Sequence, residues 1–267
     1  MSSSSPRKLR YPTDWIARRE QGEKIVILTA YDATMAKLIA RSRVDALLVG
    51  DTLGMVVQGR NTTLPVELEE VIYHARLVRR GAPDMFLIGD MPFASYQADV
   101  AQGARNAFRL FKEAEVNAVK FEGAHPDTLR VMEKLIAAGA PVMGHIGFTP
   151  QSLYTLGGYR VQGKTEAARQ ELIRQAGRLE EVGCFAMVLE LMDGETARLI
   201  TESVRIPTIG IGAGGATSGQ VLVVNDLLGL DPDFTPKHAK KYMDLGAELP
   251  DVFSEFAREV QDGEFPP

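Results

Sequence analysis

The chain has 267 residues, of which 45% are hydrophobic and 24% are charged, a composition that fits one large globular domain or two small ones. Its formal net charge of −5 argues against a nucleic acid as the main partner, because no basic excess exists to neutralise phosphates. No apolar stretch approaches the roughly 18 residues of a membrane-spanning helix, so we expect no membrane partner either.

Eight short apolar segments recur along the chain, and each ends at a polar or glycine-rich corner. Segments of this length and composition are typical of strands buried on both faces of a parallel sheet. In chain order, the predicted strands are Ile25–Ala30, Ala46–Val49, Met85–Ile88, Ala118–Phe121, Pro141–Met143, Phe185–Leu189, Pro207–Ile211 and Gln220–Val224. The corner residues that follow them are Asp32, Asp51, Asp90, Glu122, His145, Glu190, Gly212 and Asn225.

Amphipathic helical patterns separate many of these strands. Apolar residues repeat at helical spacing within 100–111, 129–136 and 172–179, and Pro126 and Gly139 mark the start and the end of the second pattern. Strands that alternate with such helices form βαβ units. No low-complexity linker interrupts the pattern, so we predict one domain over residues 1–267, with short flexible termini at about 1–8 and 262–267.

The alternation predicts an α/β protein, and closure into a (β/α)₈ TIM barrel competes with an open, doubly wound sheet. Ionisable residues favour the barrel, because they gather at the carboxyl ends of the predicted strands, where barrel enzymes build their chemistry. These residues are Asp32, Asp51, Asp90, Lys120, Glu122, His145 and Glu190.

Asp51, Asp90 and Glu122 are candidate ligands of a divalent metal. Each follows an apolar strand, so the three carboxylates can converge at one edge of the sheet. Carboxylate oxygens are ligands that Mg²⁺ prefers, and the ion keeps water or substrate in its remaining positions. Each acid taken alone could instead cap a helix or close a turn, but three of them together favour the metal site.

Lys120 lies two residues before Glu122 and therefore points to the same face of its strand. An unpaired buried ammonium is costly, so this group needs a partner. Three roles remain open: Lys120 could hold a carboxylate or carbonyl of a substrate, form a Schiff base, or pair with Glu122 or Asp90.

Glu190 ends an apolar strand and is the candidate general base. A carboxylate in an apolar barrel mouth has its pKa raised, which makes it a better proton acceptor near neutrality. His145 is a candidate substrate-binding residue, although a single histidine after a strand is also often a hydrogen-bonded core group.

Two glycine-rich segments have weaker implications. The segment 157–164 follows the fifth strand and could close over the barrel mouth as a lid, or simply connect two elements. The segment 210–215 matches G-x-G-x-x-G, but no acid closes a following strand about 20 residues later, as a dinucleotide site requires. Close backbone approach at the barrel rim is the better interpretation.

Two observations bear on the expected compartment. Met1–Pro6 lacks the apolar segment of a secretory signal, and Cys184 is the only cysteine, so no intrachain disulfide can form. We expect Cys184 to be a buried, inert thiol and the protein to be cytoplasmic.

These motifs together resemble those of the ketopantoate hydroxymethyltransferase family over nearly the whole chain. Their order and combined length make coincidence a poor explanation. The matching segments are Thr29–Asp32, Val49–Met55, Val57–Gly59, Gly89–Phe93, Val119–Gly123, Gly144–Gln151, Gly158–Gly163 and Ile209–Gly214.

The resemblance implies a barrel of the phosphoenolpyruvate/pyruvate-binding type. It implies an enzyme that transfers a hydroxymethyl group from 5,10-methylenetetrahydrofolate to 3-methyl-2-oxobutanoate and so makes ketopantoate for pantothenate and coenzyme A synthesis. It also implies one Mg²⁺ per subunit and a homo-oligomer, usually a decamer of two pentameric rings.

Site roles carry over by motif position. Asp51 and Asp90 would bind magnesium with Glu122 as the third acid, Glu190 would accept the proton, and the 2-oxo acid would contact Asp51, Thr52, Asp90 and Lys120. Two residues depart from the family pattern. Thr52 replaces the usual serine, so its added methyl group could narrow the substrate site, and Ala124 replaces a glycine, which affects only loop geometry.

Three other functions are open to the same residues. A carbon–carbon lyase or mutase on this barrel often carries a reactive cysteine loop, but Cys184 lies in the wrong place. A Schiff-base aldolase that uses Lys120 would be trapped by borohydride and indifferent to a chelator. A non-catalytic barrel would bind no cation and would not exchange the C3 hydrogen of a 2-oxo acid.

Overall fold

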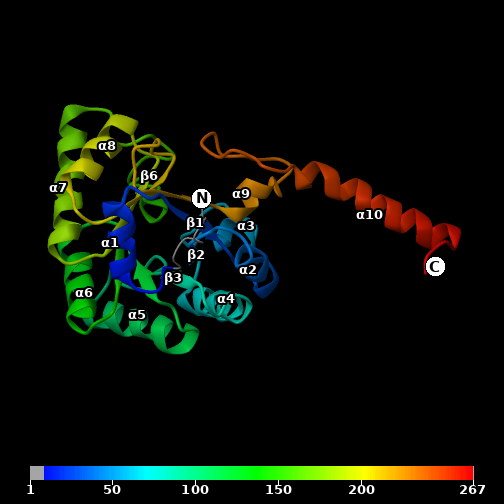
Figure 1. Ribbon diagram of the computed structural model, residues 1–267, viewed down its shortest axis with the longest axis horizontal. Helices are drawn as coiled ribbons and strands as arrows, with labels where there is room; N and C mark the ends of the chain where they lie inside the picture. The colour runs from blue at the N-terminus through cyan, green and yellow to red at the C-terminus, as the bar shows by residue number, and fades with distance from the viewer. Residues whose placement is uncertain (1–8, 267) are drawn as a thin grey trace, which may run out of the picture. The chain divides into compact units, whose positions relative to one another are not determined.

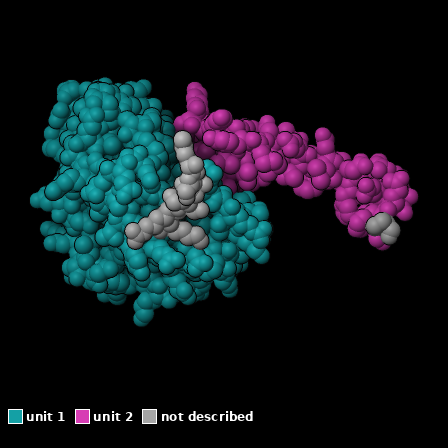
Figure 2. Space-filling view, in the orientation of Figure 1, with its two compact units in different colours: residues 1–221 teal, residues 222–267 magenta. Residues whose placement is uncertain are grey.

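The computed structural model describes residues 9–266, so the terminal segment predicted at 1–8 lies outside the described residues, as does Pro267. Two compact units are distinguished, one ending at Val221 and the other beginning at Leu222 (Figure 2). All barrel strands lie in the first unit except the last residue of the final strand. The single domain over residues 1–267 stays a prediction.

The predicted barrel is confirmed, because the eight strands pair in sequence order and close on themselves. Each strand overlaps the segment predicted for it. The strands are β1 Ile25–Thr29, β2 Ala46–Val49, β3 Phe86–Asp90, β4 Ala118–Lys120, β5 Val142–Gly147, β6 Ala186–Glu190, β7 Thr208–Ile211 and β8 Gly219–Leu222. The pairing is parallel, with Asp90 beside Lys120, so the carboxyl ends of the strands meet on one side of the barrel.

Helices surround the strands of the first unit (Figure 1). They are α1 Pro12–Glu20, α2 Ala33–Ile39, α3 Leu53–Val56, α4 Leu68–Gly81, α5 Val100–Ala114, α6 Pro126–Ala137, α7 Glu166–Glu181 and α8 Gly194–Ser203, with a 3₁₀ turn at Pro150–Ser152. Side-chain oxygens cap four of these helices at their amino ends: Asp32, Asp99, Thr165 and Asp193 each accept the N–H three residues on. Asp32 therefore has the capping role that was the alternative for each strand-end acid.

Apolar side chains fill the barrel, and α1 covers one end of it. Trp15 of α1 is fully buried and packs edge-on against Phe86 and Phe185, with ring centroids 5.1 and 5.3 Å away. Phe86 begins β3 and Phe185 directly precedes β6, so Trp15 lies at the amino ends of the strands. The carboxyl ends remain available for chemistry.

Every strand except β2 differs from its predicted bounds at one or both ends, and two of these differences change the assignment of nearby residues. β5 extends to Gly147, which places His145 inside the strand rather than after it. β8 ends at Leu222, because residues Val224–Leu228 form helix α9 in the second unit. The second unit also contains α10, Leu245–Asp262, so the flexible tail predicted from residue 262 begins where a helix ends and stays a prediction.

The glycine-rich segment between β7 and β8 shows the close packing that we predicted for it. A Cβ atom at Gly210 would lie 2.8 Å from Oγ1 of Thr217 and 3.0 Å from Nε2 of Gln220. The backbone there can approach these side chains only because residue 210 has none. Within residues 9–266, no helix has the length and apolarity needed to cross a bilayer.

Candidate active site

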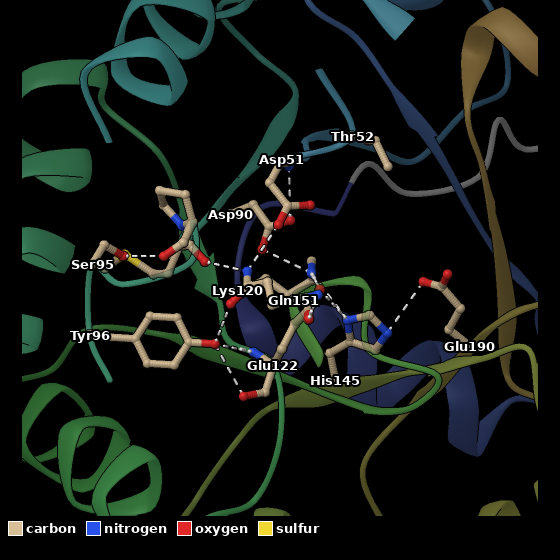
Figure 3. Close-up of polar contacts among 12 residues, drawn as sticks. Asp51, Thr52, Asp90, Ser95, Tyr96, Lys120, Glu122, His145, Gln151 and Glu190 are labelled. Atoms are coloured by element: carbon tan, nitrogen blue, oxygen red, sulfur yellow. Dashed lines mark hydrogen bonds and ion pairs between the residues drawn. The ribbon is translucent and has the colours of Figure 1, made fainter. Parts of the chain in front are cut away.

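Three carboxylates from neighbouring strands meet at the carboxyl ends of the barrel. Asp51 follows β2, Asp90 ends β3 and Glu122 follows β4, and the three residues are only 2%, 1% and 6% exposed. The backbone N–H of Asp51 donates to Oδ2 of Asp90 at 3.1 Å. Figure 3 shows the three side chains gathered around Lys120. The structure thus brings together the acids that the sequence singled out.

Lys120 is the cation of this cluster. Its Nζ lies 2.8 Å from Oδ1 of Asp90 and 3.8 Å from Oε1 of Glu122, so the ion pair weighed from the sequence is present. Burial by itself would lower the pKa of Lys120, but Asp90, Glu122 and Asp51 outweigh it and raise this pKa above its usual value. The side chain therefore stays an ammonium, which cannot attack a carbonyl, and this argues against the Schiff-base alternative.

The acids outnumber the cation that faces them. Burial and repulsion from Asp90 and Glu122 raise the pKa of Asp51 well above its usual range. Burial also raises the pKa of Asp90, although Lys120 opposes this. The pKa of Glu122 is lowered despite burial, because His145 and Lys120 stabilise its charged form. A further cation at this site would relieve the repulsion that Asp51 experiences.

The carboxylate oxygens of this cluster are of the chemical kind that a hard divalent cation binds. Asp90 Oδ1 and Glu122 Oε1 are buried carboxylate oxygens that face the cations Lys120 and His145, and a buried carboxylate oxygen is also a suitable ligand for Mg²⁺. As the side chains lie, however, no group of three or more His, Cys, Asp or Glu residues within the described range 9–266 is arranged to hold an ion. Magnesium and its three predicted ligands remain predictions.

His145 connects the acid cluster to Glu190. Its Nδ1 lies 3.2 Å from Lys120 Nζ and 3.4 Å from Glu122 Oε1, and its Nε2 lies 3.3 Å from Glu190 Oε2. Burial and Lys120 would lower the pKa of His145, but interactions with Glu122 and Glu190 raise it to about 9. Its side chain thus faces the reactive groups rather than the apolar core.

Glu190 lies in a different environment from the one we expected. The sequence suggested an apolar surrounding, but the side chain is 20% exposed and faces the polar ring of His145. It ends β6, across the barrel mouth from Asp51 (Figure 3). A partly exposed carboxylate at this place can exchange a proton with solvent.

Thr52 lies beside the cluster without bonding to its acids. Its Oγ1 is 2.8 Å from the hydroxyl oxygen of Tyr31, which ties it to the end of β1. A Cβ at Gly50 would lie 2.9 Å from the same Oγ1, so the glycine allows the threonine to sit close to the backbone. The predicted contact of Thr52 with a substrate is not tested by these distances.

Two residues of the site escaped the sequence analysis. Gln151 and Tyr96 are buried at 7% and 2% exposure, and both hydrogen-bond to the acid cluster. Gln151 belonged to a motif that supported the family resemblance, but its amide does not ionise, the raised pKa of Tyr96 keeps the phenol neutral near pH 7, and neither residue follows a predicted strand. Only their tertiary contacts identify them.

Two other sequence expectations concern Cys184 and the glycine-rich segment 157–164. Cys184 is buried at 2% exposure, and burial raises the pKa of its thiol to about 12, so it is the inert thiol that we predicted.

Tyr159 lies in the glycine-rich segment 157–164, with its ring 4.9 Å from that of Phe148 and its hydroxyl 3.7 Å from Sδ of Met55. The lid function of this segment stays a prediction.

Comparisons of the sequence identify one family. The model of the family described as ketopantoate hydroxymethyltransferase matches residues 11–267. A 3-methyl-2-oxobutanoate hydroxymethyltransferase from Leptospira biflexa is 50% identical over 247 residues, which cover 92% of each chain. A protein of the same name from Anaeromyxobacter dehalogenans is 48% identical, and the match covers 100% of this chain and 89% of that protein. Another from a Thermotoga species is 52% identical, and the match covers 91% of this chain and 90% of that protein.

Solved structures of similar shape support the barrel type. Phosphonopyruvate hydrolase in complex with oxalate and Mg²⁺ has a TM-score of 0.61 at 13% identity, covering 95% of this chain and 88% of its own. A 2,3-dimethylmalate lyase of the PEP mutase/isocitrate lyase superfamily has a TM-score of 0.59 at 15% identity, covering 94% and 88%. At these identities the similarity shows the fold alone.

Proposed function

Since this chain belongs to the ketopantoate hydroxymethyltransferase family, and so is an enzyme that forms ketopantoate from 3-methyl-2-oxobutanoate, we propose that the buried acids around Lys120 are its active site. One observation carries this proposal: Asp51, Asp90 and Glu122 lie buried around a single ammonium, next to a partly exposed glutamate. Buried charges that exceed their partners are costly to a fold and are typical of functional sites.

Asp51 and Asp90 are the residues that would hold one Mg²⁺ per subunit, with Glu122 as the third acid. Bound there, the ion would supply a Lewis acid that withdraws charge from the 2-oxo group of the substrate. The raised pKa of Asp51 and the burial of Asp51 beside Asp90 support this assignment. Lys120 neutralises part of the charge of Asp90 and Glu122.

Lys120, Thr52 and His145 would bind the 2-oxo acid together with the metal-binding aspartates. Lys120 carries a fixed positive charge, which suits the carboxylate or the ketone oxygen of the substrate. His145 lies between Lys120 and Glu190, so it can donate to an oxygen that develops charge between them.

Glu190 would act as the general base. The C3–H bond of 3-methyl-2-oxobutanoate breaks, the proton moves to the Glu190 carboxylate, and the electron pair forms the enolate. The enolate carbon then forms a bond to the methylene carbon of 5,10-methylenetetrahydrofolate. One carbon–nitrogen bond of the folate breaks as this bond forms, and that nitrogen takes the proton that Glu190 removed. Water then replaces the second nitrogen at the same carbon and gives that nitrogen a proton, which releases tetrahydrofolate and the hydroxymethyl product. Both substrates must be held in one barrel mouth for this step.

The metal role is tested by removal and readdition of the ion. We expect a chelator to abolish the transfer of the hydroxymethyl group and Mg²⁺ to restore it, because the carboxylates alone repel the enolate charge. Asp51→Asn should require a higher Mg²⁺ concentration for half-maximal activity. Full activity in a chelator, with the ion shown to be absent by metal analysis, would contradict the proposal.

The chain is proposed to form a homo-oligomer, in the decamer of two pentameric rings that the family resemblance implies. Helix α10 supports self-association, because it buries none of its residues and exposes an apolar side chain every three or four positions. Exposed residues of this kind are Val252, Phe253, Phe256 and Val260. A second copy of the same chain would provide an apolar partner for them.

We expect Phe256→Asp to reduce the assembled mass, because a charge in an apolar contact is costly. Light scattering after gel filtration measures this mass. Gln261→Asp places the same charge on an exposed polar position of the same helix and should leave the mass unchanged. An unchanged mass in both variants would exclude α10 from the assembly contacts.

A further inference from the structure

Each acid of the cluster has one oxygen held by a neutral N–H group. Oδ2 of Asp51 accepts from Nε2 of Gln151 at 2.9 Å, and Oδ2 of Asp90 accepts from the backbone of Asp51 at 3.1 Å. Oε2 of Glu122 accepts from the backbone of Gln151 at 3.0 Å. Gln151 therefore supplies two of these three N–H groups, and it connects acids that follow β2 and β4.

The Gln151 amide has one orientation that its neighbours permit. Nε2 donates both to Asp51 and to the carbonyl oxygen of Met91, each at 2.9 Å. Oε1 accepts from the Tyr96 hydroxyl and from Nε2 of Gln97, again at 2.9 Å. A flipped amide would place its oxygen against a carboxylate and a carbonyl and its NH₂ against a donor, so the contacts fix the side chain.

Tyr96 completes a ring of hydrogen bonds around Gln151. Its hydroxyl accepts from the backbone N–H of Glu122 at 3.1 Å, and its single proton can go either to Gln151 Oε1 at 2.9 Å or to the Glu122 carbonyl at 3.2 Å. The shorter contact favours Gln151. Glu122 is thus tied to Gln151 twice, once by its carboxylate and once through Tyr96.

We infer that Gln151 is a positioning residue for the reaction: it holds Asp51 and Glu122 by one oxygen each, so that the remaining oxygens are oriented for the metal and the 2-oxo acid. The inference rests on the proposed function of the cluster. A neutral amide suits the task, because it fixes the carboxylates without cancelling the negative charge that a cation needs. Lys120 acts differently, since it is charged and its ammonium faces the other oxygens, Asp90 Oδ1 and Glu122 Oε1.

The variant Gln151→Met tests this role, because methionine has similar length but cannot donate, while the backbone N–H to Glu122 remains. We expect the affinity of the enzyme for Mn²⁺, used as a probe that electron paramagnetic resonance detects, to fall about 10–100-fold. We expect kcat to fall by a similar factor and KM for 3-methyl-2-oxobutanoate to change less, since misplaced acids mainly affect the transition state. Gln170→Met, on the exposed face of α7, is the matched control and should resemble the parent.

A second variant covers the case in which Gln151→Met does not fold. Tyr96→Phe removes the hydroxyl that holds Gln151 Oε1 but leaves both N–H donors to the carboxylates, so Mn²⁺ affinity and kcat should fall less, by several-fold. If Gln151→Met or Tyr96→Phe folds and keeps the parental Mn²⁺ affinity and kcat, the positioning role of Gln151 is overturned. The proposed function of the cluster is not affected by that result. A parent enzyme that binds no Mn²⁺ and needs no metal would instead overturn the proposed function of the cluster.

Discussion

Replacement of Glu190 by glutamine should slow deuterium exchange at C3 of 3-methyl-2-oxobutanoate by about 10²–10⁴-fold, the usual contribution of a general base. The amide keeps the shape of the side chain but cannot accept the proton. Glu190 ends β6 with its Oε2 3.3 Å from His145 Nε2, so the substitution changes few other contacts. Exchange followed by proton NMR in Mg²⁺ and deuterated water, without the folate, isolates this step.

The control for this prediction is Glu202→Gln, which changes an exposed glutamate on α8 and should exchange at the parental rate. Exchange that persists at the parental rate in Glu190→Gln would remove Glu190 as the base.

Replacement of Lys120 by methionine should have the second large effect, because it alters both stability and activity. The substitution removes the ammonium that lies 2.8 Å from Asp90 and 3.8 Å from Glu122. Breaking a buried pair by loss of one partner costs about 3–5 kcal/mol in the free energy of unfolding, since the other charge stays buried without compensation. Urea denaturation, with and without Mg²⁺, measures this loss, and added metal should recover part of it.

Activity and trapping separate the binding role of Lys120 from the Schiff-base alternative. We expect hydroxymethyl transfer to fall strongly in Lys120→Met, and we expect borohydride with 3-methyl-2-oxobutanoate to leave the parent enzyme unmodified, because the Lys120 amine stays protonated. Lys134→Met, at an exposed site on α6, should change neither property. A borohydride adduct at Lys120, located by mass spectrometry, would contradict this assignment.

The destabilisation should also be specific to the unpaired charge. In Lys120→Met combined with Asp90→Asn, the carboxylate closest to the missing ammonium is neutral as well. We therefore expect the double variant to be more stable than Lys120→Met alone. Equal or lower stability of the double variant would show that packing, rather than charge, explains the loss.

The strands could be predicted closely because their signals are local. β2 has the predicted bounds, and β6 differs by one residue at each end. A short apolar segment followed by an acid indicates both the strand and its end, and this pattern depends only on neighbouring residues. The longer β5 was underestimated, because the polar ring of His145 resembles a strand end although it faces the barrel interior.

The acids could be assigned to one site for a similar reason. Parallel strands of a closed barrel place all their carboxyl ends on the same side, so Asp51, Asp90 and Glu122 had to gather once the strand order was known. No such rule applies to Gln151 and Tyr96. Amide and phenol side chains occur both on protein surfaces and in buried sites, and the positions of these two residues in the chain did not indicate that they are buried.

The sequence by itself determined eight strands with acids and one lysine at their carboxyl ends and favoured closure into a barrel, because periodicity and strand ends are encoded in neighbouring residues. The tertiary structure alone decided how these groups pair: that Lys120 contacts Asp90, that His145 connects Glu122 with Glu190, and that Gln151 holds two acids. The physical reason is that a hydrogen bond depends on distances of a few tenths of an ångström between residues far apart in the chain, which only the packed fold sets.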